Sequence, residues 1–449
     1  MDTIVRRCAG LDVHKASVEV CARVLDETDD VRKTVRRFPT MTPDLRKLAR
    51  WLKGLGVTHV AMESTGVYWM PIYNILEEDF TVLLCNARHI KNVPGRKTDV
   101  ADCEWIAQLL QHGLLSGSFI PPRAQRNLRD LTRHRAQLVG EKTRVANRVQ
   151  KILEDANIKL ASVASDPLGV SGRAMIHALI AGEKDAKKLA ALARRRLKGK
   201  IPELKRALEG HFTEHHRFML SRHMHHLDFL ERQIEDFEAQ IDQLSTGPEL
   251  SPPAPPENED EPPSSPDADN DGSDGEADPP TPLGFDEAVA AICDVPGLNI
   301  ISATTLLAET GVDMSHFPTH KHLASWSRIC PGNYESAGKR KSGRTGKANR
   351  WLRRVLCQCA WAATRSKNTY FAAQYRQIAK RRGKKRAIIA VAHSMLTVVY
   401  HILKYQRPYE ELGPDFFDKI DPKRKARYHV KRLEELGHRV ILEQQEAAA

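Results

Sequence analysis

The sequence predicts an α/β domain at the N-terminus followed by mostly helical structure, and three features of the chain support this. The first third of the chain alternates short, β-branched apolar runs with segments whose apolar residues recur at helical spacing. The next part, to about residue 247, carries apolar residues at intervals of three, four and seven. An acidic, proline-rich stretch then precedes a further helical part. Strand–helix alternation is typical of a sheet with parallel pairing that is covered by helices.

The N-terminal elements can be assigned one after another. Two apolar runs, at 6–14 and 16–25, are joined by a short polar turn, which indicates a hairpin. Residues 41–56 have apolar positions at helical spacing and end in glycine, which predicts a helix. The later segments are predicted as a strand, a helix and a strand: 57–65, 67–80 and 81–87.

The middle of the chain has a heptad pattern. Apolar residues recur every seven positions at Leu131, Leu138, Val145 and Ile152, and a second seam runs over 227–244. About three repeats is the minimum for predicting a coiled coil. An ordinary antiparallel helix pair inside one chain is an equally good interpretation. The first helix is also rich in arginine, which is typical of a solvated face but also suits contact with phosphates.

Charge is distributed unevenly. The formal net charge is +12, although residues 251–280 hold nine prolines, ten acidic residues and no lysine or arginine. Such a segment cannot bury a core and is expected to be disordered. The rest of the chain is therefore more basic than the total, which indicates a polyanionic partner such as nucleic acid. A basic enzyme without such a partner is the alternative.

Other features narrow the class of protein. The eight cysteines form no CxxC pair, so we expect no zinc ribbon. We expect the protein to be in a reducing compartment. The N-terminus lacks an apolar core of signal-peptide length. The most apolar stretch, 387–403, is shorter than the roughly 20 apolar residues of a spanning helix and contains two histidines. We therefore expect a cytoplasmic protein without a membrane partner.

Four carboxylates stand out near the predicted sheet. Asp12 and Glu63 lie at the ends of predicted strands, and Asp99 and Asp102 are three residues apart at the start of a predicted helix, on one face. Hard oxygen donors of this kind suit Mg²⁺, which assists attack on phosphodiesters. The basic flanks, including Arg96 and Lys97, would guide nucleic acid toward them. The simpler reading is that Asp99 caps the helix and Asp12 opens a turn.

A second candidate site lies in a loop before a C-terminal helix. The loop contains Ser336, Ser342, several glycines and many cations. A serine hydroxyl in a cationic loop can bind phosphate, or it can act as a nucleophile if its deprotonation is assisted. The cations predicted to contact nucleic acid are Arg340, Lys341, Arg344, Arg350, Arg353 and Arg354. Upstream, 292–311 partly matches a helix-hairpin-helix, with Asn299 at the position of its second glycine; a plain helix pair is the alternative.

Four motifs occur in a fixed order: "GLDVHK", "AMESTGVYW", "KTDVADCEWIAQLL" and "PGNYESAGKRKSGRTGKANRWLRRVL". Together they resemble the DEDD transposases of insertion sequence family one-hundred-and-ten, over about 1–155 and 284–410. The resemblance implies a RuvC-like (RNase H fold) α/β domain, a helical coiled-coil middle and a mostly α-helical C-terminal transposase domain. The expected division is 1–127, 128–247, a linker at 248–283, 284–410 and a charged tail at 411–449.

The resemblance also implies roles for residues and partners. Asp12, Glu63, Asp99 and Asp102 would be the DEDD ligands of Mg²⁺, and Ser336, rather than Ser342, the nucleophile that joins DNA covalently. The carboxylates and the serine would meet across subunits in a dimer or tetramer assembled through the coiled coil. A guide RNA encoded beside the gene would pair with donor and target DNA, in the nucleoid of a prokaryotic cell. The alternatives are a RuvC-like junction nuclease that uses metal-bound water, and a non-catalytic ribonucleoprotein scaffold.

Overall fold

The structure, a computed structural model of the whole chain, divides into two compact units, Met1–Pro121 and Pro122–Ala449, which are described separately. The described residues are 3–26, 30–64, 66–86, 90, 101–247, 250, 282–331, 334–336, 339–342, 345, 349–420 and 422–442. The acidic stretch at 251–280, expected to be disordered, lies outside them.

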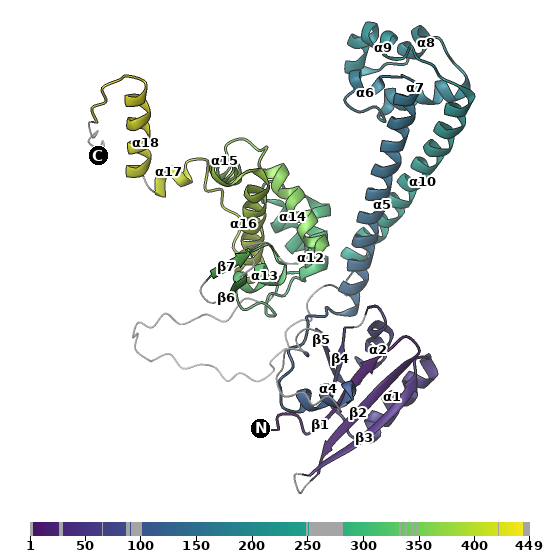
Figure 1. Ribbon diagram of the computed structural model, residues 1–449, viewed down its shortest axis with the longest axis vertical. Coiled ribbons are helices and arrows are strands. Elements are labelled where there is room, and N and C mark those ends of the chain that lie inside the picture. Colours follow the sequence, from purple (N-terminus) through teal and green to yellow (C-terminus); the bar gives the residue numbers. More distant parts are fainter. Residues whose placement is uncertain are drawn as a thin grey trace, which may run out of the picture. The chain divides into compact units, whose positions relative to one another are not determined.

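The N-terminal unit is built on a five-stranded sheet with strand order β3-β2-β1-β4-β5 (Figure 1). The strands are β1 (Arg7–Val13), β2 (Ser17–Leu25), β3 (Val31–Pro39), β4 (His59–Glu63) and β5 (Thr81–Cys85). β1, β2 and β3 pair antiparallel, whereas β1 pairs parallel with β4, and β4 with β5. The predicted α/β class with parallel pairing is therefore confirmed. The sequence reading missed β3, an edge strand rich in exposed cations.

Helices cover both faces of this sheet. The helices α1 (Thr42–Gly54) and α2 (Trp69–Leu76) pack on one face, in a core that includes Leu11, Val20 and Met62. The other face carries α4 (Asp102–Gln111), whose Ile106 and Leu109 pack with Cys8 and Ala61. Because side chains alternate along a strand, even positions of β1 and odd positions of β4 face α4.

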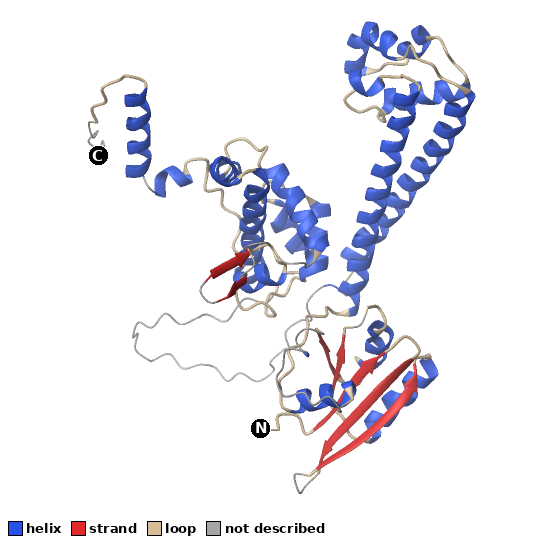
Figure 2. Ribbon diagram, in the orientation of Figure 1, coloured by secondary structure: helices blue, strands red, loops and turns tan. Residues whose placement is uncertain are grey.

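The second unit begins with a helical arm (Figures 1 and 2). Two long helices, α5 (Arg123–Asp155) and α10 (Glu214–Ser245), pack along each other. Ion pairs from Arg135 to Glu238 and from Lys142 to Glu231 show that they run antiparallel. The seam predicted from Leu138 and Val145 is thus buried inside one chain. Short helices join the two at the tip: α6 (Leu160–Val163), α7 (Val170–Ala181), α8 (Ala186–Ala191), η1 (Arg195–Lys200) and α9 (Ile201–Ala207).

The rest of the second unit is mostly helical, with one small hairpin (Figure 2). Its elements are α11 (Phe285–Cys293), α12 (Ile300–Thr310), α13 (His320–Trp326), β6 (Tyr334–Ser336), β7 (Lys339–Ser342), α14 (Arg350–Ala363), α15 (Tyr370–Arg382), α16 (Lys384–Tyr405), α17 (Phe416–Ile420) and α18 (Pro422–Glu435). We refer to α11–α16 as the C-terminal domain.

The helix α16 is the core of the C-terminal domain. Within the described ranges it is the helix that is both long and apolar enough to cross a membrane. It packs against α11, α13, α14 and α15, however, and ten of its residues are buried. The apolar stretch therefore serves as a core helix.

Candidate active site

Two of the four predicted carboxylates lie at the ends of neighbouring parallel strands. Leu11 of β1 is in register with Met62 of β4, so Asp12 and Glu63 occupy the next equivalent positions. Both face α4, since Cys8 and Ala61 have the same parity and pack with that helix. The pairing of β1 with β4, which separates these residues by 51 positions in the chain, therefore brings the two carboxylates side by side.

Gly10 allows α4 to pack close to β1, near the strand ends that carry Asp12 and Glu63. A Cβ atom at Gly10 would lie 2.3 Å from both the Ala107 nitrogen and the Cys103 oxygen, so the helix backbone rests directly on β1. The amide of Ile4, before β1, donates to the carbonyl of Gln111 at the end of α4 (2.9 Å), which makes α4 run antiparallel to β1. Asp102, the first residue of α4, therefore lies at the end of the sheet where β1 finishes at Asp12 and Val13.

Gly10→Ala is expected to weaken the site through this contact. The added methyl group must push α4 away from β1, which costs about 1–3 kcal/mol of unfolding free energy and moves Asp102. Guanidinium unfolding and a DNA-cleavage assay measure the two effects. Gly54→Ala is the matched control, because a Cβ atom there meets nothing within 4 Å. Equal stability and cleavage in both variants would contradict the contact.

The surroundings of Asp12 include residues that sequence reasoning missed. The Nε2 of His14 lies 3.1 Å from the Asp12 Oδ2. Across β1 and β2, Glu19 stands directly opposite Asp12, and the Arg37 Nε lies 3.8 Å from its Oε1. Glu19 could have been found from the alternation of side chains along a strand, which places it on the face that carries α4 once the hairpin register is known. Burial, and then Cys21 and the carboxylates of Glu19 and Glu104, raise the pKa of the Cys103 thiol to about 12, so it stays protonated beside the site.

The donor set suits a hard divalent cation, although the described residues do not by themselves complete a metal site. Asp12, Glu63 and Asp102 supply carboxylate oxygens, the ligand type that Mg²⁺ prefers. No group of three or more His, Cys, Asp or Glu residues in the described ranges is close enough to hold an ion. The fourth predicted ligand, Asp99, lies outside those ranges, as do Arg96 and Lys97. The N-cap of α4 is Ala101, without a side-chain cap.

The β6–β7 hairpin positions the backbone of the two candidate serines. Ser336 pairs with Lys339 next to the turn, and Ser342 pairs with Tyr334 at the open end. Arg340 pairs with Glu335. The two serines therefore occupy different places, one at the tip and one at the base of the hairpin. The sequence alone did not show that a hairpin would form here.

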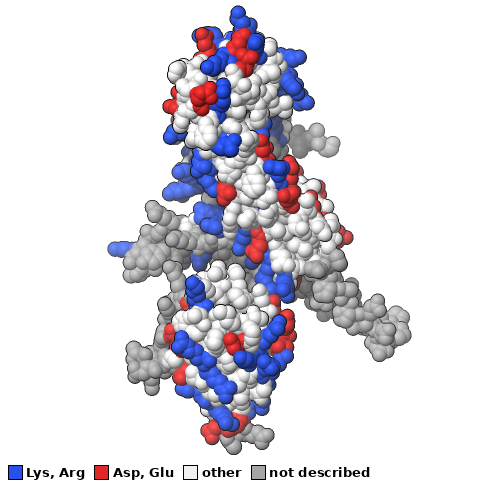
Figure 3. Space-filling view, turned by 90° about the vertical axis from the view of Figure 1, so that its right-hand side faces the viewer, with Lys and Arg blue, Asp and Glu red and all other residues white. Residues whose placement is uncertain are grey.

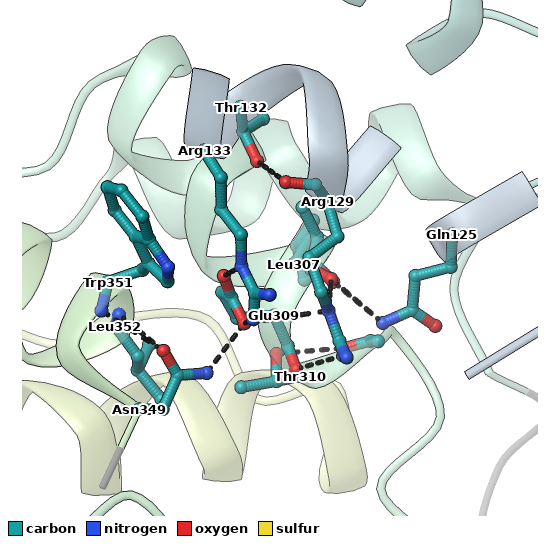
Figure 4. A network of polar contacts seen from close by, with 12 residues as sticks. Gln125, Arg129, Thr132, Arg133, Leu307, Glu309, Thr310, Asn349, Trp351 and Leu352 are labelled. Atoms are coloured by element: carbon teal, nitrogen blue, oxygen red, sulfur yellow. Dashed lines mark hydrogen bonds and ion pairs between the residues drawn. The ribbon is translucent and has the colours of Figure 1, made fainter. Parts of the chain in front are cut away.

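A buried network of polar contacts joins the arm to the C-terminal domain (Figure 4). Glu309, at the end of α12, is fully buried. The guanidinium of Arg133 donates to both of its carboxylate oxygens at 2.7 Å, and the Arg129 Nε lies 3.5 Å from one of them. Arg129 also donates to the carbonyls of Ala308 and Glu309. These arginines of α5 thus bind protein rather than phosphate, which the sequence left open.

The same network reaches the residue that follows the serine loop. Asn349 donates from Nδ2 to Glu309 (2.6 Å), and its Oδ1 accepts from the amides of Trp351 and Leu352, which caps α14. Burial, more than its neighbours, lowers the pKa of Arg129 to about 10, which leaves it charged near neutral pH. The start of α14 is therefore held by the arm and by α12 together.

The structure describes the side chains of some of the residues that the sequence predicts to contact nucleic acid. Arg350 is exposed, with its guanidinium 4.6 Å from the centre of the Trp351 ring. Arg353 is half-buried, and Arg354 donates to the Ala136 carbonyl (3.3 Å). Arg340 and Lys341 belong to β7, and Arg344 lies outside the described residues. Figure 3 shows many lysines and arginines, interspersed with carboxylates, over the viewed face.

The turn before α12 shows why asparagine replaces a glycine there. Asn299 is the N-cap of α12: its Oδ1 accepts from the Ser302 amide (3.0 Å), and its own amide donates to the Ser302 hydroxyl (2.8 Å). Gly297 has a φ of +90°, and a Cβ atom on it would lie 2.5 Å from the Cys359 oxygen. The first glycine is thus required by the contact with α14, whereas the second position is used to cap a helix.

Comparison with known proteins gives two matches to family models. A model of the IS110 DEDD transposases, described as "Transposase", matches residues 9–158, and one described as "Transposase IS116/IS110/IS902 family" matches residues 289–376. No curated protein matches the chain. The first match contains the strands and the helix that carry Asp12, Glu63 and Asp102, and the second contains the β6–β7 hairpin and α14. The chain therefore belongs to the IS110 family of transposases, and it is a DNA transposase.

Proposed function

We propose that this transposase excises and inserts its own mobile element, with a carboxylate site on a RuvC-like domain (1–127) and a serine nucleophile on a transposase domain (284–410). Asp12, Glu63, Asp99 and Asp102 would hold Mg²⁺, and Ser336 would attack DNA. The observation that carries the proposal is that β1, β4 and α4 bring three of these carboxylates to one end of one sheet face. That arrangement suits cleavage or transfer of a phosphodiester, whose negative charge a bound Mg²⁺ would neutralise.

The chain's own residues account for the bond changes. The Ser336 oxygen would form a bond to phosphorus while the bond from phosphorus to a sugar oxygen breaks, and that oxygen leaves with a proton. A free sugar hydroxyl from the other DNA end would then attack the same phosphorus and release the serine. Each step exchanges one phosphoester for another, so no external energy source is needed. Ser336 rather than Ser342 is proposed because, as the family resemblance implies, it follows closely on the Pro-Gly pair at 331–332 and precedes the first glycine of the loop after it.

The partners are part of the proposal. The carboxylates and the serine belong to separate compact units, which is consistent with a composite site assembled from different subunits. Self-association through the helical arm of α5 and α10, the region that the sequence predicts as a coiled coil, would bring such subunits together as a dimer or tetramer. The excess of lysine and arginine supports DNA and a guide RNA as ligands. The protein would act in the prokaryotic cytoplasm, at the nucleoid.

A covalent-trapping assay tests the nucleophile. Full-length protein, Mg²⁺, labelled element-end DNA and RNA from the flanking region are mixed, denatured and separated on a gel. DNA shifted with protein is expected for the unchanged protein and for Ser342→Ala, and no shifted DNA for Ser336→Ala. Cleaved DNA without a shifted band, unaffected by Ser336→Ala, would instead identify a nuclease that uses metal-bound water.

A further inference from the structure

A pocket of about 450 Å³ lies in the C-terminal domain, and none of its lining residues belongs to either proposed site. It is formed by the first turn of α15, the second half of α16 and the segment after α16, with contributions from Tyr370, His393, His401 and Tyr409. No residue of the β6–β7 hairpin and no residue of the Glu309 network lines it. Neither proposed site therefore accounts for this pocket.

Flat rings form much of its wall. The ring of Tyr409 stacks on Phe371 with centroids 6.2 Å apart and an interplanar angle of 13°. The ring of His401 stacks on Tyr405 at 5.5 Å and 25°. These pairs hold the rings in fixed orientations, which lowers the entropy cost of stacking a further planar group on them.

The pocket also offers imidazole nitrogens that no described residue uses as a hydrogen-bond partner. No residue in the described parts of the chain hydrogen-bonds to the ring nitrogens of His320, His393 or His401. Burial, and then His320, lower the pKa of His393 and of His401, so both are neutral near pH 7. A neutral imidazole has one donor and one acceptor. The three rings are not arranged as a metal site, since no such group occurs among the described residues.

Positive charge stands beside the pocket. Arg407 lines it and is exposed, with its guanidinium 5.7 Å from the centre of the Tyr405 ring. The ammonium of Lys404 lies 5.8 Å from the same ring but donates to the Pro318 carbonyl (2.8 Å), and Glu410 lines the pocket beside Arg407. A planar, hydrogen-bonding ligand with an anionic group placed toward Arg407 would satisfy the rings, the imidazoles and this cation together.

We propose that this pocket binds an unpaired nucleobase of a single-stranded nucleic acid, with the base stacked on the aromatic rings and the adjoining phosphate paired with Arg407. Stacking on aromatic side chains and hydrogen bonding to exposed base edges are how proteins hold unpaired bases. Strand exchange and RNA guidance both produce such bases, so the inference draws on the proposed function for its ligand. It does not depend on Ser336.

The test compares two pentanucleotides with full-length protein by fluorescence anisotropy. One carries a single adenine between abasic sites and the other is abasic throughout, so only the base differs. The unchanged protein is expected to bind the adenine form about 10-fold or more tightly, as a stacked base typically contributes. His393→Leu and Tyr409→Leu should remove this preference while leaving affinity for the abasic form within about twofold. Arg407→Ala should weaken binding of both forms alike, through the lost phosphate contact.

The experiment also includes matched control variants and a comparison of DNA with RNA pentanucleotides. Trp361→Leu removes an exposed aromatic residue that packs at a tilt against Tyr375 outside the pocket, and it should keep the preference. Thr397→Phe fills the pocket, and it replaces Tyr409→Leu as the pocket variant if circular dichroism shows that Tyr409→Leu is unfolded. DNA and RNA pentanucleotides distinguish the two sources of the base. Equal affinity for the two forms in the unchanged protein, or a preference that survives the pocket variants, would overturn the proposal.

Discussion

Asp12→Asn is expected to abolish DNA cleavage and covalent trapping, with a loss greater than the 10- to 100-fold (about 1.4–2.8 kcal/mol) that removing a partner of a metal ligand typically costs. The amide keeps the size of the side chain but removes the charge that the proposed Mg²⁺ site requires. It also removes like-charge repulsion between strand-end carboxylates. Without metal, the variant should therefore be as stable as the unchanged protein or slightly more stable.

Thermal unfolding with and without Mg²⁺ separates the two effects. The unchanged protein should be stabilised by added Mg²⁺ because the ion binds the folded state, whereas Asp12→Asn should show little stabilisation. Asp44→Asn is the matched control: Asp44 pairs with Lys47 on α1, on the opposite face of the sheet. A variant that keeps full cleavage, or that responds to Mg²⁺ like the unchanged protein, would remove Asp12 from the site.

Glu309→Ala is expected to cost about 3–5 kcal/mol of the stability of the C-terminal domain, the typical effect of removing one partner from a buried ion pair. The substitution leaves Arg129, only 14% exposed, and Arg133 without their carboxylate. It also removes the acceptor of Asn349, so the start of α14 should loosen. Glu309→Gln, which keeps shape and part of the hydrogen bonding, should cost less.

Hydrogen exchange of the amides in α12 and α14 under native conditions tests this prediction, because it reports the local stability of one domain in a chain of several parts. Glu238→Ala is the control. It removes the partner of Arg135, but Glu238 is 38% exposed, so the loss should be about 0–1 kcal/mol. Similar protection in Glu309→Ala and Glu238→Ala would show that the network contributes no more than a surface pair.

The main elements of the N-terminal unit could be predicted from sequence because their patterns are local. The apolar alternation of β1 and β2 and the helical spacing of α1 correspond to elements of the structure. β3 was missed because an edge strand buries few side chains, and its pairs of adjacent cations leave no apolar alternation to recognise. The heptad seam predicted long helices, but periodicity does not show whether the facing helix belongs to the same chain or to another.

The candidate site shows the same limit. The residue types and the motif order marked Asp12, Glu63 and Asp102, and the family comparison agrees with the class of enzyme they indicated. The parallel register of β1 with β4 and the close approach of α4 at Gly10 could not be read from spacing, because they join segments tens of residues apart. Glu19 and His14 became visible only with that register.

The sequence by itself determined the class of protein: a basic chain with an α/β domain, long helices and ordered motifs of an IS110 transposase. Only the tertiary structure decided which of its charges face one another. For the arginines of α5, which include Arg129 and Arg133, the sequence left open a solvated face or contact with phosphates, but α12 places the carboxylate of Glu309 against these two. The reason is physical: a charge that is buried away from water needs an opposite charge or a hydrogen-bond partner. Packing between segments that are distant in the sequence determines which residue becomes that partner.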